Sequence, residues 1–342
     1  MKTNRCALIL VSTVAFLGSG AAPSLAQVVG TTAAEEFGED VIFLEPEAEA
    51  VPEAQPAFVE PVLPDTIPAD GQDEPTADEP ATPPAEVTET PPHIERFNAG
   101  LAQYREGNDE LAIEEFNAAI AINAEYAPAY LFRGAAFTRL DNTSAALNSY
   151  NQALSIDTNY SAAYLNRGIL YYDLGETSLA TQDFDRAIAI APDSATAYIY
   201  RGLISSEQGN QQAALEYLND AVALDPNNAS AYFHRGLVFK SLNSPQSAIS
   251  DFTQAIDIEG DYAAAFLNRG VAYYSVGETN NALRDFNRAV DLDENNVESY
   301  YNRSFALISQ DRPRAAVDDL NQVLPLEPGN ANAYLIRGQV YA

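Results

Sequence analysis

The chain has few of the residues from which most catalytic and metal sites are built. Its 342 residues include one cysteine, two histidines and no tryptophan. The cysteine is Cys6, near the N-terminus, and the histidines are His93 and His234. The rest of the sequence offers no thiolate ligand, no disulfide and no Gly-x-Ser-x-Gly nucleophile turn. We therefore expect no enzyme activity, no catalytic residues and no cofactor.

Basic residues are also scarce. The chain has 18 Lys and Arg against 49 Asp and Glu, which gives a formal net charge of −31. A nucleic-acid-binding protein needs a basic surface that neutralises phosphates, and docking on anionic lipid needs the same sign of charge. The composition therefore excludes nucleic acid and an anionic membrane surface as partners.

One stretch could be mistaken for a metal site. Asp291-x-Asp293-x-Asn295 is similar to the start of an EF-hand loop, but Asn296 stands where that loop needs glycine, and Asn302 stands where it needs glutamate. We expect no metal at this stretch, and we interpret it as a turn between two repeats.

Residues 1–26 have the features of a secretory signal peptide. Lys2 and Arg5 precede the short apolar run 7–17, and Ser24-Leu25-Ala26 has the small-x-small form of a cleavage site. The alternative is a retained membrane anchor, for which the run is short. The sequence predicts export through this signal, to the periplasm or the exterior.

Residues 27–92 form a segment of different composition. They are rich in Glu, Asp, Pro and Ala and contain no Lys or Arg. Like charges repel one another and prolines prevent regular hydrogen bonding, so we predict a disordered acidic arm. The arm acts as a tether or as a solubilising spacer. Its compact apolar patch, Val41-Ile42-Phe43-Leu44, is a candidate docking peptide for a partner or for the chain's own groove.

The rest of the chain repeats one pattern, aromatic-x-x-Arg-Gly. The pattern recurs every 34 residues, with Ser304 in place of one glycine. A fixed period of this size indicates stacked supersecondary units that bury their apolar faces against one another. The repeated arginines are Arg133, Arg167, Arg201, Arg235, Arg269, Arg303 and Arg337.

Each unit contains two helical stretches. Small and bulky residues recur at three- and four-residue spacing, as in Ala180, Phe184 and Ala187, which is the spacing of one helix face. Proline is tolerated in a first helical turn, so Thr90-Pro91-Pro92 opens the first helix and Pro245 and Pro313 begin later ones. Pro325 comes late in a helix and should end it early. Glycines separate the two helices of a unit at Gly107, Gly175, Gly209 and Gly277.

These units resemble the tetratricopeptide repeat family, whose unit is a pair of antiparallel helices, A and B. The resemblance implies an all-α fold, a right-handed α-solenoid over residues 93–342. It also implies a non-enzymatic scaffold that binds a peptide or a partner protein in its concave groove. The predicted repeats are 93–126, 127–160, 161–194, 195–228, 229–262, 263–296 and 297–330, with a closing helix at 331–342.

The resemblance also selects groove residues on the A helices. Repeated asparagines there could pair with both the N–H and the C=O of an extended peptide. The alternative is that the apolar members pack between repeats, which we expect for about half of them. The family's clamp for chaperone tails is absent, because Leu131 and Thr196 stand where it needs lysine. The predicted groove residues are Leu131, Phe132, Leu165, Asn166, Ile169, Tyr200, Leu203, Phe233, His234, Leu237, Asn268, Val271, Asn302 and Phe305.

The repeated arginine departs from the family, which usually carries an apolar residue at this position. An aspartate precedes the bulky residue of the second helix in four units, at Asp183, Asp251, Asp285 and Asp319. We predict that the arginines form a structural ladder, in which each guanidinium pairs with such an aspartate of the same or the adjacent unit. The alternative is a ladder that binds an anionic ligand.

Two further alternatives remain open from the sequence. The acidic arm could bind the cell wall or a cationic partner, with the solenoid as a spacer or a self-association module. The closing helix is unusually apolar, with Leu335, Ile336, Val340 and Tyr341. A terminal repeat should have a polar outer face, so either a homodimer covers this helix or the sequence is part of a longer chain.

Overall fold

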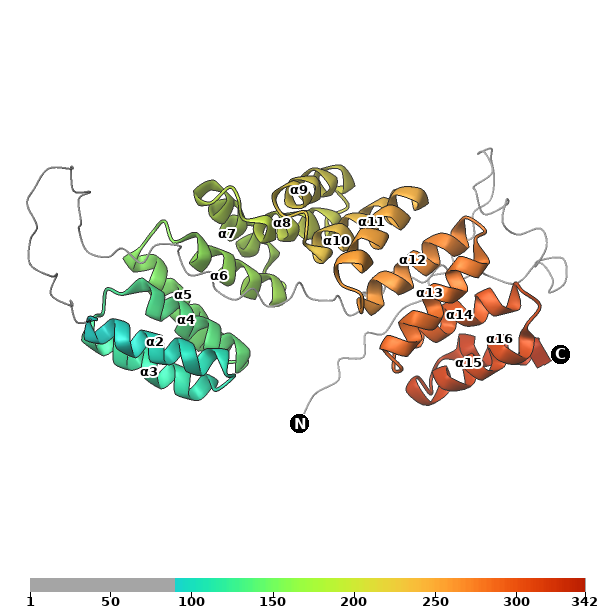
Figure 1. Ribbon diagram of the computed structural model, residues 1–342, viewed down its shortest axis with the longest axis horizontal. Coiled ribbons are helices and arrows are strands. Elements are labelled where there is room, and N and C mark those ends of the chain that lie inside the picture. The colour runs from blue at the N-terminus through green and yellow to red at the C-terminus, as the bar shows by residue number, and fades with distance from the viewer. Residues whose placement is uncertain (1–89, 342) are drawn as a thin grey trace, which may run out of the picture. The chain divides into compact units, whose positions relative to one another are not determined.

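The computed structural model describes residues 90–341, and all structural statements below refer to them. The predicted signal peptide, most of the acidic arm and the apolar patch Val41–Leu44 lie outside this range. The described residues form helices α2 to α16 and contain no strand, as the all-α prediction requires (Figure 1).

The helices have similar lengths and follow one another at short intervals. The first begins at Pro92, as the Thr90-Pro91-Pro92 stretch predicts. Their bounds are α2 Pro92–Arg105, α3 Asp109–Ile122, α4 Ala127–Arg139, α5 Thr143–Ile156, α6 Ser161–Asp173, α7 Thr177–Ile190, α8 Ala195–Glu207, α9 Gln211–Leu224, α10 Ala229–Ser241, α11 Pro245–Ile258, α12 Ala263–Ser275, α13 Thr279–Leu292, α14 Val297–Ile308, α15 Pro313–Leu326 and α16 Ala331–Tyr341.

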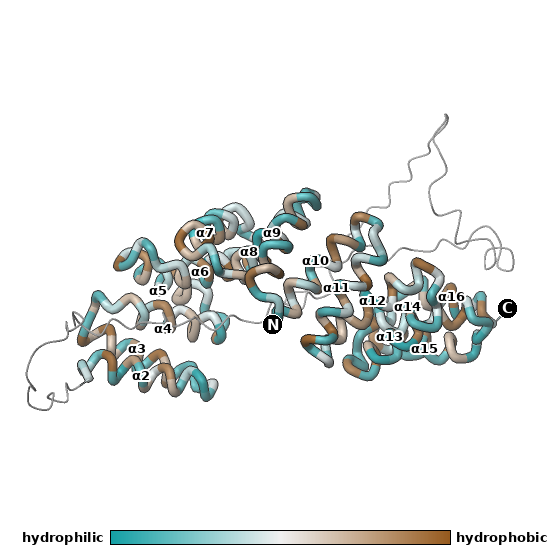
Figure 2. The backbone as a smooth tube through the Cα atoms, turned by 45° about the horizontal axis from the view of Figure 1, so that its top comes forward, coloured by the Kyte–Doolittle hydropathy of each residue, from teal (hydrophilic) through white to brown (hydrophobic). Residues whose placement is uncertain are grey.

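Each helix packs against the next one in the chain. An even-numbered helix pairs most closely with the odd-numbered helix that follows it, and the pair then contacts the next pair. Most even-numbered helices also contact the next even-numbered helix. We call the side on which α10, α12 and α14 meet the inner surface. Brown and teal alternate along the helices in Figure 2, because each helix buries one apolar face against its neighbours.

The repeated spacing of glycine and aromatic residues within this chain brings the two helices of a pair into close approach. A Cβ atom added to Gly236 would lie 2.7 Å from Phe252 Cε1, and one added to Gly134 would lie 2.5 Å from Tyr150 Cε1. Both rings are almost fully buried. Only a residue without a side chain fits opposite these rings, which explains the glycine of the repeated pattern.

Ser304 is the exception at this position, and it lies opposite a leucine. It is fully buried, and its hydroxyl donates a hydrogen bond to the backbone carbonyl of Tyr301. The facing residue, Leu320, is also fully buried. A serine is therefore accommodated where the partner is a flexible aliphatic side chain.

The turns between the paired helices need a residue in the left-handed region. Gly107, Gly175, Gly209 and Gly277 have φ between 74° and 82°, as the sequence predicts. In the other units the same place is taken by Asp141, Asn243 and Asp311, with φ between 54° and 56°. Aspartate and asparagine tolerate this conformation better than other residues with a Cβ, so the turn is preserved without glycine.

The expectation for Pro325 was wrong. Helix α15 continues through this proline to Leu326 and is as long as the equivalent helices. Pro325 is exposed and lies next to the last helical residue, whereas Val323 and Leu324 before it are buried. A proline this close to the end removes only one late hydrogen bond, which the buried contacts of the same turn outweigh.

None of the described helices is both long enough and apolar enough to cross a lipid bilayer.

Candidate functional site

The repeated arginines form the most regular polar feature of the structure. In four units the guanidinium donates two hydrogen bonds, of 2.6 to 2.9 Å, to one aspartate of the following helix. These arginine side chains are 15–18% exposed and the aspartates 6–9%. The predicted pairing is therefore present in these units, and it is bidentate and largely dry. The pairs are Arg167–Asp183, Arg235–Asp251, Arg269–Asp285 and Arg303–Asp319.

The same arginines also reach back to the preceding unit. In six units Nη1 donates to a side-chain oxygen 16 residues earlier, at 2.6 to 3.1 Å. Each arginine lies on an even-numbered helix, and each except Arg337 bonds to the odd-numbered helices before and after it. The acceptors are Asn117, Asn151, Asn219, Thr253, Asn287 and Asn321.

Arg201 has the reverse arrangement. Its carboxylate partner is Asp185 of the preceding unit, at 2.6 Å, and its partner in the following helix is the hydroxyl of Tyr217, at 3.0 Å. Asp185 replaces the usual asparagine, and Tyr217 replaces the usual aspartate. The unit therefore keeps one carboxylate for its arginine, but the carboxylate comes from the other side.

Arg133 has no carboxylate partner among residues 90–341. Its guanidinium bonds to the Asn117 side-chain oxygen at 2.8 Å and to the Ser149 hydroxyl at 3.2 Å. Burial lowers the pKa of Arg133, whereas the hydrogen bond that Arg235 donates to Asp251 raises the pKa of Arg235.

The aromatic residue of the repeated pattern also contacts its arginine. The guanidinium carbon lies 5.0 to 5.5 Å from the ring centre in six units, counted from Tyr130 to Tyr334. Residues three apart on a helix share a face, so the x-x spacing positions the ring beneath the cation. The arginine, its aromatic residue and its carboxylate together explain the pattern structurally, without an anionic ligand.

The predicted groove residues divide into two groups. Five are partly exposed: Ile169, Leu237, Val271, Asn302 and Phe305. The other nine are buried and pack between helices: Leu131, Phe132, Leu165, Asn166, Tyr200, Leu203, Phe233, His234 and Asn268. The buried side chains fill the space between neighbouring helix pairs, so they do not present a surface to a partner. This corrects the larger groove that the residue pattern suggested.

The repeated asparagines do not offer a free amide. In each of them Nδ2 donates to the backbone carbonyl four residues earlier, at 2.8 to 2.9 Å, in Asn166, Asn268 and Asn302. Asn166 and Asn268 are also buried. The expected two-sided pairing with a peptide backbone therefore does not apply to these two residues as they stand.

A polar diagonal crosses the inner surface from α10 to α14. Lys240 Nζ donates to Asn268 Oδ1 at 2.7 Å, and Glu298 of α14 lies beyond them. The pKa of Lys240 is lowered by burial, and the charge of Glu298 partly opposes this effect. The pKa of Glu298 is raised by burial, and the charge of Lys240 partly opposes this effect. The two charges therefore act on one another, yet they form no ion pair in the described structure.

One member of this diagonal stands out in the sequence. Lys240 is the one lysine after Lys2. Sequence reasoning missed Glu298, which stands where the preceding units have Ala264, Ser230 and Thr196. A charged residue at an otherwise small position of a repeat was the signal available.

His234 is a second unusual group near this region. It is 2% exposed, and neither ring nitrogen has a hydrogen-bond partner in the described part of the chain. Its ring centre lies 5.3 Å from that of Phe233. Burial lowers the pKa of His234 to about 4.

We expect this histidine to make the protein sensitive to mild acid. Below the ordinary pKa of 6.5 the His234 ring binds a proton in the unfolded chain but stays neutral in the folded chain. The free energy of unfolding therefore falls as the pH drops from about 6.5 to about 4. The full effect is about 3 kcal/mol. Urea unfolding of the parent and of His234→Asn across this range tests it, because Asn268 and Asn166 show that asparagine fits the equivalent position. A parent and variant with parallel pH profiles would exclude this role.

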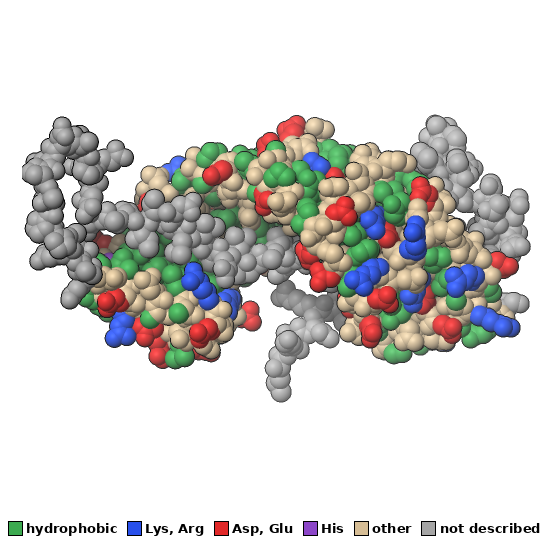
Figure 3. Space-filling model, in the orientation of Figure 1, with side chains coloured by type: hydrophobic (Ala, Val, Ile, Leu, Met, Phe, Trp, Pro, Cys, Tyr) green, Lys and Arg blue, Asp and Glu red, His purple; other side chains and the backbone are tan. Residues whose placement is uncertain are grey.

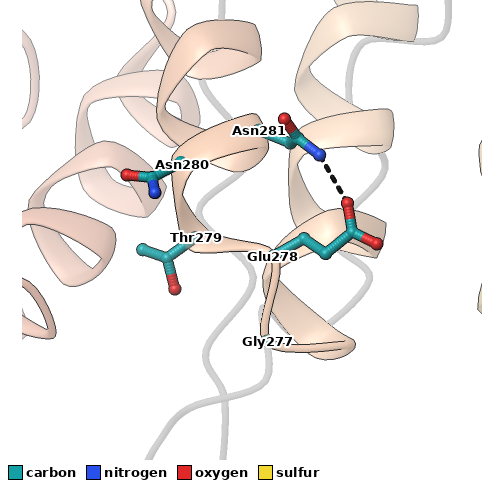
Figure 4. Close-up of a pocket in the computed structure, with 5 residues that line it drawn as sticks. All are labelled: Gly277, Glu278, Thr279, Asn280 and Asn281. Atoms are coloured by element: carbon teal, nitrogen blue, oxygen red, sulfur yellow. Dashed lines mark hydrogen bonds between the residues drawn. The ribbon is translucent and has the colours of Figure 1, made fainter.

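One surface depression lies apart from these residues. It has a volume of about 330 Å³ and lies at the start of α13, where Gly277, Glu278, Thr279, Asn280 and Asn281 line it (Figure 4). Asn281 donates a hydrogen bond to Glu278 across it, and Asn280 accepts one from Gln310 of the next unit. The depression is an open turn whose polar groups bond to one another and to the neighbouring repeat.

Family models match the repeated part of the chain. Models described as tetratricopeptide repeat match residues 165–229, 201–258 and 263–296, and one described as TPR repeat matches residues 134–175. No curated protein matches the chain.

Solved structures share the fold. A chain of the APC/C hetero-tetramer Cut9–Hcn1 is similar with a TM-score of 0.62 and 19% identity, over 71% of this chain and 48% of that one. PilF of Pseudomonas aeruginosa has a TM-score of 0.58 and 20% identity, over 63% and 98%. A tetratricopeptide repeat protein from Parabacteroides merdae has 0.53 and 19%, over 73% and 99%. This chain thus spans about half the length of the Cut9–Hcn1 chain. At these identities the likeness shows the fold alone, and the matched models identify residues 134–258 and 263–296 of this chain as tetratricopeptide repeats.

Proposed function

We propose that the protein is a non-enzymatic interaction scaffold, and that the inner surface of α10, α12 and α14 binds an extended segment of a partner protein. The observation that carries the proposal is the diagonal of Lys240, Asn268 and Glu298. It places a half-buried ammonium on one repeat and a half-buried carboxylate two repeats further on, without closing them into a pair.

An arrangement of this kind is costly unless something completes it. Removing a charge from water costs free energy, and a partner of opposite charge offsets that cost only when it is in contact. Desolvated charges without a full set of partners are concentrated at binding sites. A peptide backbone completes this one well, because its C=O can accept from Lys240 and its N–H can donate to Glu298.

The surroundings suit a peptide. Leu237 lies three residues before Lys240 on α10, and Val271 lies three residues after Asn268 on α12. Phe305 lies on α14, and all three side chains are partly exposed. They offer apolar contacts beside the charged groups. The fold supports the proposal too, since the family consists largely of protein-binding scaffolds.

A peptide-display selection against the whole protein tests this function. We expect selected peptides to lose at least about tenfold in affinity with Lys240→Met or Glu298→Gln, since each substitution removes one charge-assisted contact worth about 1.5–3 kcal/mol. Arg314→Gln, an exposed substitution away from the inner surface, serves as the control. Peptides that bind all four proteins equally would show that the diagonal is not part of a binding site.

A second candidate function rests on the acidic arm, which would bind a cationic partner or the cell wall. Deleting residues 27–92 separates the two candidates. The scaffold should still bind its selected peptides after the deletion, whereas an arm-driven interaction should disappear.

Export and self-association are also proposals of ours. Export is supported by the composition of residues 1–26, and cleavage after Ala26 in the purified protein would establish it. Homodimerisation through α16 is supported by the exposure of Tyr334, Leu335 and Tyr341. Analytical sedimentation of the parent and of Leu335→Glu tests this proposal. If both proteins sediment as monomers, homodimerisation through α16 is excluded.

A further inference from the structure

A second pocket lies in the ladder region, between α11, α12 and α13. Its volume is about 250 Å³, and its lining residues are Thr253, Arg269, Tyr273, Asn281, Arg284 and Asp285. None of these belongs to the polar diagonal of the inner surface. The pocket is therefore separate from the peptide site proposed above.

The pocket lies at the one ladder position that lacks an amide or a carboxylate in the preceding unit. Thr253 replaces the asparagine or aspartate that the other units have there. Its hydroxyl accepts from Arg269 Nη1 at 3.1 Å and donates to the Ile249 carbonyl at 2.7 Å. The threonine side chain is shorter than asparagine, and the Arg269 side chain beside it is 15% exposed.

The pocket has more positive than negative charge. Asp285 receives both of its hydrogen bonds from Arg269, at 2.7 and 2.8 Å, and so is already neutralised. Arg284 bonds to the side-chain oxygen of Asn281 and forms no ion pair within the described residues. Asp257 also acts on Arg269, but it does not line the pocket. One guanidinium is thus left without a carboxylate.

The surroundings strengthen this charge locally. Arg288 lies one turn beyond Arg284 on α13, with its guanidinium 5.9 Å from the ring centre of Phe266. Lys and Arg side chains gather over α11 to α15 on the face shown in Figure 3. The chain as a whole carries −31, but salt screens charges beyond about 8–10 Å at physiological ionic strength. An anion at the pocket therefore responds mainly to the nearby arginines.

We infer that this pocket binds an oxyanion, a carboxylate or a phosphate group presented by a ligand. Arg284 supplies a planar set of N–H donors suited to two oxygen atoms of one group, and the Tyr273 hydroxyl can donate a further hydrogen bond. Arg269 also lines the pocket, and it remains bonded to Asp285.

Titration of the full chain with inorganic phosphate, and separately with acetate, tests this inference. The readout is the NMR signal of the arginine Nε–H groups, with sodium chloride at matched ionic strength as the reference. We expect the Arg284 signal to shift in a saturable way with at least one oxyanion and not with chloride. A response to phosphate alone identifies a phosphate site, and a response to both anions identifies a site that also accepts carboxylates.

The matched variants are Arg284→Gln and Arg314→Gln. Both residues are exposed, so both variants should fold as the parent does. In these variants the Arg269 signal reports on the pocket. We expect the anion affinity obtained from its saturable shift to fall at least about tenfold in Arg284→Gln and to stay unchanged in Arg314→Gln. Shifts that chloride reproduces, or that Arg284→Gln leaves unchanged, would overturn the inference.

Discussion

Arg235→Leu is expected to destabilise the protein by about 3 kcal/mol, because it leaves a buried carboxylate without its partner. Asp251 is 4% exposed and receives two hydrogen bonds from Arg235, at 2.7 and 2.8 Å. The substitution also removes the bond to Asn219 of the preceding unit. Urea unfolding followed by far-UV circular dichroism measures the loss.

The double variant Arg235→Leu/Asp251→Leu separates charge from packing. Replacing a buried pair by apolar residues is often close to neutral, so the double variant should recover much of the stability that the single variant loses. Arg235→Lys should lie between the parent and Arg235→Leu, since an ammonium cannot form the planar two-bond contact. If both single variants kept the parent melting temperature, the arginines would not stabilise the fold, and the anion-binding alternative would gain weight.

Gly236→Val should cost about 3 kcal/mol, through overpacking of the contact between α10 and α11. The new Cβ would lie 2.7 Å from Phe252 Cε1 and 2.9 Å from its Cδ1. Phe252 is fully buried. Because each repeat is stabilised mainly by its neighbours, we expect the transition to broaden or split as the helices on either side of the damaged pair unfold separately.

The chain contains its own controls for this prediction. Gly338 occupies the same place in α16 and has no atom within 4 Å of an added Cβ, so Gly338→Val should change stability by no more than about 0.5 kcal/mol. Gly202 faces Leu218, with an added Cβ at 2.6 Å from its Cγ. Ser304 beside Leu320 indicates that Gly202→Ser should cost less than Gly236→Ser. Equal losses at Gly202, Gly236 and Gly338 would mean that the close approach is not the cause.

The period of the sequence predicted the helix pairs and the turns because these recur at the same place in every unit, and it predicted the arginine–aspartate pairs because they recur in four units. The contact between Lys240 and Asn268 joins residues 28 apart, and Glu298 lies 30 further on. Neither separation equals the repeat of 34, since the contact runs obliquely from one repeat to the next. Aligning equivalent positions therefore hides it, and three-dimensional packing was needed to find it.

Local departures from the pattern were harder to interpret for a related reason. The reversed pairing of Arg201 depends on Asp185 and Tyr217 together, and neither residue is informative alone. The burial of Asn166 and His234 depends on how closely adjacent helix pairs pack, which the residue types do not specify. Pro325 was misjudged because a general rule about proline takes no account of the buried residues beside it.

The placement of the ladder acceptors has a consequence for how such a chain can change its number of repeats. Each repeated arginine before Arg337 uses one acceptor 16 residues before it and another 16 residues after it, as Arg235 does with Asn219 and Asp251. Excising residues 229–262 would bring Asn219 to the place of Thr253, so Arg269 would still find one amide and one carboxylate. Excising residues 195–228 would instead give Arg235 two carboxylates, Asp185 and Asp251. Repeats of this protein are therefore not freely interchangeable, and the unit that contains Arg201 can be lost only if a neighbouring charge changes as well.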